Sequence, residues 1–214
     1  MRDKTYRSLT LSTNLEELIL VKKKTIIKLA SVTILLNSGM ALFPHLAPAT
    51  STVQASSTSV AAKALGIDVA SYQSADLTAH AKAGSQFAVV KVSEGTGYRN
   101  PKGASQIKSA IANDMMPMGY HFATFSSNAS LAKKEAQYAI SSAKALGLPK
   151  GSYLACDYET GQGKIITNGK SVTAKAILAF MDEIKAAGYQ PLLYASSSVL
   201  QNNINTPSIV KKYP

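Results

Sequence analysis

Residues 151–159 read Gly-Ser-Tyr-Leu-Ala-Cys-Asp-Tyr-Glu, an apolar run that ends in two carboxylates. The run predicts a buried β-strand over Tyr153–Asp157, because short apolar runs of this kind are typical of parallel strands. Side chains alternate along a strand, so Asp157 and Glu159 point to the same face with Cα atoms about 6.5 to 7 Å apart. Carboxylates this close repel, and one tends to keep its proton near neutral pH. The pair therefore suits acid–base chemistry.

Strand-like and helix-like segments alternate around this run from Leu65 onward. The sequence predicts further strands at Leu65–Ala70, Phe87–Val92, Met116–Phe122 and Leu192–Tyr194, and helices at Leu77–Ala83, Pro101–Ala112, Leu131–Leu146 and Val172–Ala187. Glycines 84, 147 and 188 follow three of these helices and are expected to end them. Apolar strands that alternate with helices predict an α/β fold with a parallel sheet.

Chemically capable side chains fall at the C-terminal ends of five predicted strands: Asp68, Glu94, His121, Asp157 and Tyr194. The ends of parallel strands meet at one edge of the sheet, where ligand chemistry collects. A barrel uses the whole rim, whereas an open doubly wound sheet binds its ligand at the switch point. The nearest approach to a phosphate loop has five residues between Gly163 and Gly169 instead of four, so no phosphate loop supports the doubly wound sheet. The segment after Glu159 is interpreted as a flexible loop of this rim.

Residues 1–55 predict an N-terminal extension and a secretory signal. Lys22-Lys23-Lys24 precede the mostly apolar Leu29–Leu46, and small residues that suit cleavage follow. Polar residues and Pro44 interrupt the apolar part, so a membrane anchor is the weaker alternative. Residues 56–64 are interpreted as a linker, and 65–214 as the folded domain. We expect a secreted protein that meets the membrane only through its signal segment.

The net charge of +11 indicates either a polyanionic partner or a solvated surface. Residues 65–214 hold 15 Lys or Arg and nine Asp or Glu, which leaves +6 for the folded domain. Nucleic acid is not expected, because the lysines are scattered and no basic–aromatic cluster is present. Cys156 is the only cysteine, so no intramolecular disulfide can form. Its position predicts a small buried side chain on the face opposite Asp157, and not a catalytic thiol.

Four motifs, in this order, resemble the glycoside hydrolase family 25 lysozymes: Gly66-Ile-Asp-Val-Ala-Ser-Tyr-Gln73, Val90-Lys-Val-Ser-Glu-Gly-Thr-Gly-Tyr98, Gly119-Tyr-His-Phe122 and Asp157-Tyr-Glu159. These lysozymes are peptidoglycan muramidases of the Chalaropsis type with a flattened, TIM-like β/α barrel. The resemblance covers roughly Leu65 to Leu200. It implies a wall-associated monomer, with no cofactor or metal, that hydrolyses the β-1,4 bond between N-acetylmuramic acid and N-acetylglucosamine in peptidoglycan glycan strands.

Carried over by motif, Glu159 is the expected general acid. Asp157 and Asp68 are expected to stabilise the 2-acetamido group or the developing positive charge. Roles in binding the sugar are implied for seven further residues: Glu94, Tyr72, Gln73, Tyr98, Tyr120, His121 and Tyr194. The sequence leaves open whether a carboxylate nucleophile or the acetamido group of the substrate completes the reaction.

Several of these residues also have a structural interpretation. Asp68 could accept hydrogen bonds from the backbone of a loop or helix start. Glu94 could pair with Lys91, His121 could be a hydrogen-bonded core histidine, and Tyr194 could serve packing alone. The carboxylate pair is harder to explain this way, because burying two acids without a function costs free energy.

The family pattern also includes later strands with a Trp-rich motif and a further acidic residue. This chain stops at Pro214, shortly after the strand predicted at Leu192–Tyr194, and contains no Trp. We therefore expect an incomplete barrel with exposed sheet edges. Two other functions stay open: a cell-wall-binding protein with lost or weak hydrolase activity, and a related carboxylate barrel that acts on chitin, although the longer acidic signature of that class is absent.

Overall fold

The structure is a computed structural model that describes residues 8–10, 60–159 and 168–214. The predicted signal segment, part of the predicted linker and the predicted loop after Glu159 lie outside these residues. Within the described ranges, no helix is long and apolar enough to cross a membrane.

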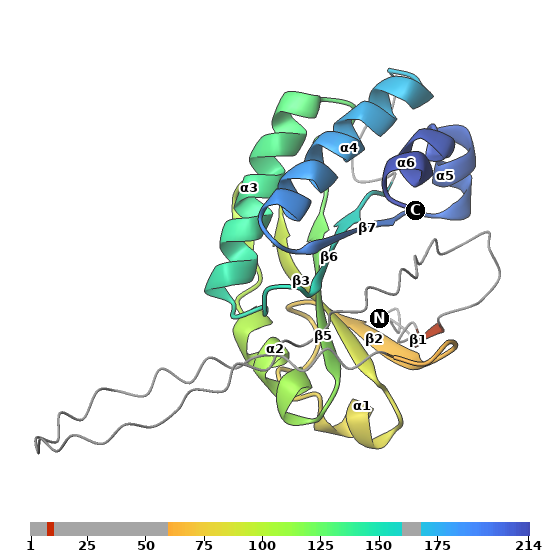
Figure 1. The fold of residues 1–214 in the computed structure, drawn as a ribbon. Coiled ribbons are helices and arrows are strands. Elements are labelled where there is room, and N and C mark those ends of the chain that lie inside the picture. Colours follow the sequence, from red (N-terminus) through yellow and green to blue (C-terminus); the bar gives the residue numbers. More distant parts are fainter. Residues whose placement is uncertain (1–7, 11–59, 160–167) are drawn as a thin grey trace, which may run out of the picture.

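A seven-stranded sheet forms the centre of the molecule (Figure 1). Its order is β1 (Ser8–Thr10), β2 (Leu65–Val69), β3 (Phe87–Glu94), β5 (Met116–Phe122), β6 (Tyr153–Asp157) and β7 (Gln190–Tyr194), with the short β4 (Tyr98–Arg99) paired to β3. The pairs from β2 through β7 along this path are parallel, whereas β1 and β4 are antiparallel to their partners. Parallel strands thus lie side by side in chain order.

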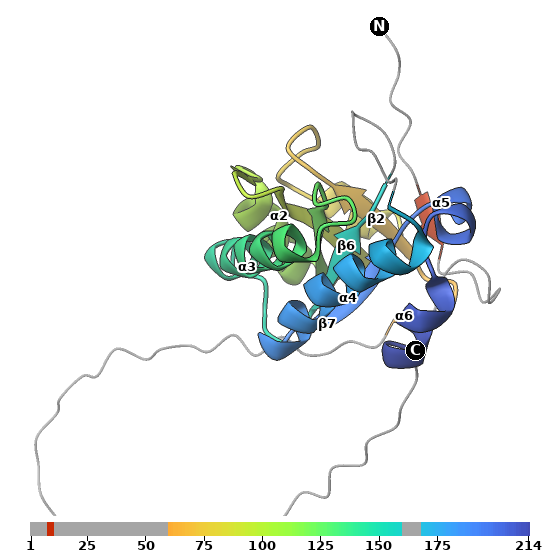
Figure 2. The same cartoon turned by 90° about the horizontal axis from the view of Figure 1, so that it is seen from above.

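Helices connect the parallel strands: α1 (Thr78–Lys82), α2 (Gly103–Ala112), α3 (Ala129–Ala145) and α4 (Lys170–Ala186). Right-handed crossovers between strands that are always added in one direction place their helices on the same face. Seen from above, α2, α3 and α4 follow one another along one side of the strands (Figure 2). This winding is that of a β/α barrel, because a doubly wound sheet carries helices on both faces.

Local sequence explains where the long helices begin and end. The side chain of Asn128 caps α3 by accepting a hydrogen bond from the backbone N–H of Leu131 at 3.0 Å. Past the ends of α3 and α4 stand Gly147 and Gly188, with φ of 79° and 86°. Glycine enters this left-handed region without steric cost, which confirms both as helix stops.

The predicted strands and helices are all present, with ends that differ by one or two residues. Pro101 lies just before α2 and not in its first turn. The sequence analysis missed four short elements: β1, β4, α5 (Ser197–Asn202) and α6 (Thr206–Lys212). Among the described strands β1 and β7 are the two edges, so the sheet is not closed. The predicted α/β fold, an unclosed β/α barrel, is confirmed.

The main core lies between the sheet and its helices. Val90, Leu154 and Cys156 of the strands belong to the same buried cluster as Ile177 and Phe180 of α4. Cys156 is fully buried, as predicted. A second, smaller cluster of Ala64, Phe87 and Met118 is separate from this core. Alternation along β3 and β5 places Phe87 and Met118 on the opposite face of the sheet.

Candidate active site

The face of the sheet opposite α2, α3 and α4 is here called the site face, and four residues form a row across it. The strand register pairs Glu94 with Phe122, Phe122 with Asp157, and Asp157 with Tyr194. All four side chains are half-buried. Because neighbouring strands lie about 4.8 Å apart, the row brings the ends of β3, β5, β6 and β7 into one site.

Glu159 extends this site just beyond the end of β6. Between the two acids, Tyr158 is buried on the helix side, where its hydroxyl donates to the carbonyl of Ser126 at 2.8 Å. The backbone N–H of Tyr158 donates to the carbonyl of Tyr194 at 2.8 Å, so the chain still runs beside β7. Asp157 and Glu159 are both half-buried, in agreement with the alternation predicted from the sequence.

Tyr120 lies on the site face, and its hydroxyl is affected by the charges of the predicted catalytic acids. Burial raises the pKa of its phenol, and the negative charges of Asp68 and then Asp157 raise that pKa further. Tyr98 and Glu159 contribute in the same direction. The hydroxyl of Tyr120 therefore keeps its proton and is available as a hydrogen-bond donor. Asp68, Asp157 and Glu159 thus all act electrostatically on the same phenol.

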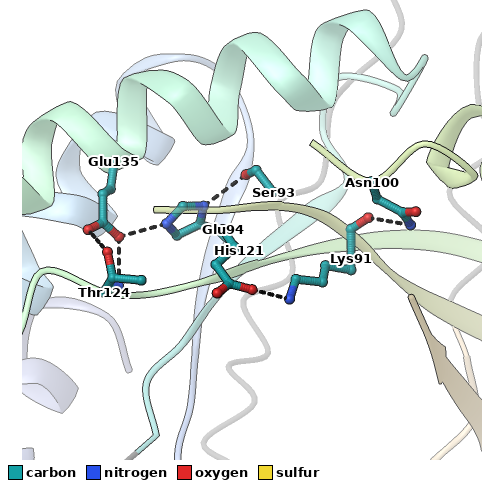
Figure 3. Close-up of polar contacts among 7 residues, drawn as sticks. All are labelled: Lys91, Ser93, Glu94, Asn100, His121, Thr124 and Glu135. Atoms are coloured by element: carbon teal, nitrogen blue, oxygen red, sulfur yellow. Dashed lines mark hydrogen bonds and ion pairs between the residues drawn. The ribbon is translucent and has the colours of Figure 1, made fainter. Parts of the chain in front are cut away.

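Lys91 places a positive charge beside Glu94 on the site face. Its Nζ lies 2.6 Å from Glu94 Oε2, and 5.4 Å and 4.9 Å from the ring centroids of Tyr98 and Phe122. Figure 3 shows this ion pair and the hydrogen bond from Asn100 to the Lys91 carbonyl. The Glu94–Lys91 pairing that the sequence left open is present. It holds the Glu94 carboxylate in one place, which suits an acceptor for sugar hydroxyls.

A bulge in β3 explains why Lys91 and Glu94 can meet. The β3–β5 register shifts between Lys91 and Ser93. An extra residue in a strand reverses the alternation beyond it, so Glu94 joins Lys91 on the site face while Ser93 is buried. The sequence analysis missed Lys91 and Phe122 as site residues, because it examined the polar strand ends alone.

The loop after β2 carries two further predicted residues. Tyr72 is 84% exposed, an unusual position for a large aromatic side chain and one open to a sugar ring. Gln73 instead shapes its own turn, because its Oε1 accepts from the N–H of Ala70 at 2.8 Å. The carbonyl of Gln73 accepts from Lys102 Nζ at 2.8 Å, which ties this loop to the start of α2.

His121 does not lie on the site face. Its side chain is fully buried, with Nδ1 2.8 Å from Ser93 Oγ and Nε2 2.9 Å from Glu135 Oε2 (Figure 3). The ring also stacks on Phe180 of α4 at 5.3 Å between centroids. The predicted contact of His121 with substrate is therefore wrong, since neighbours in a strand face opposite ways and Tyr120 takes the site face. The alternative, a hydrogen-bonded core histidine, is confirmed.

The described residues contain no group of three or more His, Cys, Asp or Glu side chains placed to hold a metal ion. What they offer is a set of carboxylates with a phenol donor, at the C-terminal ends of parallel strands wound in barrel order. Paired carboxylates of this kind carry out glycoside hydrolysis, and the rim is where β/α barrels place their chemistry. The fold and the site together define a glycoside hydrolase.

The chain belongs to glycosyl hydrolases family 25, whose model matches residues 67–214. It is 43% identical over 151 residues to a lysozyme of Lactococcus phage mv1, which covers 71% of this chain and 75% of that protein. It is also 37% identical over 150 residues to a D-alanyl-L-alanine endopeptidase of Streptococcus phage B30, of which only 31% is covered. The resemblance carried by the four motifs is confirmed.

A solved structure similar to this chain is that of the modular Cpl-1 endolysin complexed with a peptidoglycan analogue. Its TM-score is 0.56 and its sequence identity 28%, over 69% of this chain and 40% of the endolysin. The chain thus spans well under two thirds of the modular relatives that it matches, so the activities of those whole proteins do not transfer to it directly.

Proposed function

We propose that this chain acts as a lysozyme and hydrolyses the β-1,4 bond between N-acetylmuramic acid and N-acetylglucosamine in peptidoglycan. Membership of family 25 and the 43% identity to a phage lysozyme support the proposal. The observation that carries it is the strand register that places Asp157 between Phe122 and Tyr194 on the site face, with Glu159 just beyond the end of β6.

The site contains the groups that the reaction needs. The transition state resembles an oxocarbenium ion, which requires a proton donor on the leaving oxygen and negative charge near the anomeric carbon. In the proposed mechanism Glu159 protonates the glycosidic oxygen as the bond to the anomeric carbon breaks. Asp157 and Asp68 stabilise the positive charge or orient the acetamido group. Water then adds to the anomeric carbon and returns a proton to the Glu159 carboxylate. The nucleophile is either a carboxylate of the protein or the acetamido group of the substrate.

Substrate binding is assigned to the residues around these acids. Tyr120 donates a hydrogen bond from its protonated hydroxyl, and Glu94, fixed by Lys91, accepts from sugar hydroxyls. Tyr72, Tyr98 and Tyr194 offer aromatic faces to sugar rings. Gln73 supports the loop that presents Tyr72.

We further propose that the protein is secreted and acts as a monomer on the glycan strands of a bacterial wall. The charge pattern of residues 22–46 supports export. The net charge of +6 on residues 65–214 favours attraction to a polyanionic envelope. Fractionation of expressing cells, with N-terminal sequencing of the exported form, tests the location. Size-exclusion chromatography with light scattering tests the monomer.

Mass spectrometry of digested peptidoglycan tests the activity. Purified full-length chain is incubated with insoluble peptidoglycan, and the soluble fragments are reduced with borohydride before analysis. Muramic acid at the reduced end supports the proposal, whereas glucosamine at that end contradicts it. Chitin oligosaccharides serve as the control substrate and should stay intact.

A wall-binding protein with weak or no turnover is the second candidate, and the unclosed sheet among the described strands favours it. An open edge at β7 leaves one side of the carboxylate row without a neighbouring strand in the described part of the chain. Co-sedimentation with peptidoglycan in the absence of released reducing ends would select this candidate over the lysozyme.

A further inference from the structure

Glu135 is a buried acid that the proposed mechanism does not use. It is the only acidic residue of α3, and its side chain has no exposed area, although Lys133 and Lys134 beside it are exposed. A carboxylate buried this far is costly unless hydrogen bonds compensate it. Its partners therefore indicate what it does.

Both oxygens of Glu135 hold the end of β5. Oε2 accepts a hydrogen bond from the backbone N–H of Thr124 at 2.8 Å, and Oε1 accepts from the Thr124 hydroxyl at 2.5 Å. Oε2 also lies 2.9 Å from His121 Nε2. On the other side of the ring, His121 Nδ1 lies 2.8 Å from the hydroxyl oxygen of Ser93 (Figure 3).

The segment held by Glu135 lies between the two strand ends that carry Glu94 and Asp157. On one side the N–H of Gly95 donates to the carbonyl of Phe122 at 3.3 Å. On the other side the N–H of Ala123 donates to the carbonyl of Asp157 at 2.9 Å. The Gly95 turn also rests against Thr124, since a Cβ added to Gly95 would lie 3.2 Å from Thr124 Oγ1.

Ser93 and His121 each stand next to a residue of the site face. Ser93 precedes Glu94, and His121 follows Tyr120. Because consecutive side chains leave a strand on opposite faces, fixing one neighbour from the helix side fixes the direction of the other. The four-residue network of Ser93, His121, Thr124 and Glu135 thus reaches the site face through the backbone.

We propose that Glu135 is a positioning residue for glycoside hydrolysis: by holding Thr124 and His121 from the helix side, it fixes the separation of Glu94 and Asp157 on the site face. The kinetic part of this inference rests on the proposed lysozyme function. The geometric part concerns two backbone hydrogen bonds and can be measured without substrate.

The experiment compares Glu135→Ala with Ser142→Ala in the full chain. Ser142 is the matched control, because it is a buried polar residue of the same helix whose hydroxyl accepts from Arg99 Nε at 3.1 Å and not from Thr124 or His121. We expect Glu135→Ala to lower kcat about a hundredfold with little change in KM, as small misplacements of reacting groups do. Amide hydrogen exchange of Gly95 and Ala123 should accelerate about tenfold. Ser142→Ala should leave both readouts at the wild-type level.

Glu135→Gln provides the rescue, since an amide oxygen can still accept from the Thr124 N–H and should restore most of kcat. If Glu135→Ala does not fold, Thr124→Val removes a single hydroxyl bond to Glu135 and carries the same measurements. Equal exchange of Gly95 and Ala123 in folded Glu135→Ala and Ser142→Ala would overturn the proposal, as would an unchanged kcat. The two proposals can also fail separately. If the wild type releases no reducing ends but Glu135→Ala accelerates the amide exchange of Gly95 and Ala123, the lysozyme function is refuted while the role of Glu135 in holding the two strand ends is supported.

Discussion

Lys91 and Glu94 lie on the same face of β3 although they are three positions apart, and their charged groups meet at 2.6 Å. A regular strand would send these side chains to opposite faces. The bulge between Lys91 and Ser93 adds one residue to the strand, so the alternation reverses and Glu94 points to the same face as Lys91. The ion pair therefore depends on a backbone irregularity next to the proposed catalytic acids.

Lys91→Met tests how much this pair contributes. Methionine keeps an apolar stem against the rings of Tyr98 and Phe122 but removes the charge. We expect a stability loss of about 0.5–1 kcal/mol, because Glu94 is one-third exposed and solvent screens the pair. Urea unfolding measures the loss. In a double-mutant cycle with Glu94→Gln the two effects should be less than additive, and strict additivity would show that the pair contributes nothing.

Glu159→Gln tests the assignment of the general acid. The amide keeps the shape of the side chain but cannot donate the required proton, so kcat should fall by about 10²–10⁴-fold while binding of the glycan persists. Release of reducing ends and co-sedimentation with peptidoglycan measure the two quantities. Glu183→Gln, the same change on α4, is the matched control. Retained turnover in Glu159→Gln would show that Glu159 is not the general acid.

Gly66→Ala tests the close packing between β2 and β3. A Cβ at Gly66 would lie 2.1 Å from Cζ of Phe87, so the ring must move. Overpacking of this kind costs about 1–3 kcal/mol. Gly97→Ala is the control, because nothing lies within 4 Å of its added Cβ. Thermal or urea unfolding of both variants gives the comparison, and equal stability of the two would contradict the packing described for Phe87.

Asp182→Asn tests the contact between α4 and the residues at the end of α6. Burial opposes ionisation of Asp182, but hydrogen bonds from Lys212 at 2.7 Å and Tyr213 at 2.6 Å outweigh it and lower the pKa below its ordinary value. A lowered folded-state pKa stabilises the fold above the unfolded value of about 3.9, and this contribution is lost as the pH falls through the folded pKa.

The stability difference between wild type and Asp182→Asn should therefore be constant from pH 7 to about pH 5 and shrink below about pH 4. Urea unfolding at a series of pH values measures this difference. A difference that stays flat down to pH 2 would mean that the carboxylate titrates alike in the folded and unfolded chain.

Alternation and helix stops made much of this molecule predictable. The apolar run before Asp157 fixed the place of β6, and period two put Cys156 on one face with Asp157 and Glu159 on the other. Strand alternation also bears on His121, for which the sequence analysis predicted contact with the sugar. Tyr120 and His121 are neighbours in a strand, so both could not contact the sugar.

Other features depend on contacts that the sequence does not display. The bulge in β3 becomes visible only when its register with β5 is known. Glu135 sits among the buried alanines 132, 136 and 139 of α3, so its helical position indicated burial. Its partners could not be named, because they come from a different strand and loop that only the tertiary structure places beside it.

The two-sided character of β3 and β5 limits how these strands can be altered. Positions 94, 120 and 122 are partly exposed on the site face, whereas positions 93 and 121 meet the helix layer. A library that seeks altered glycan preference can randomise the first set while leaving the second unchanged. A single-residue insertion or deletion in either strand would exchange the two sets and lose both the site and the core at once. Length variation in this protein is therefore expected outside β3 and β5, and not within these strands.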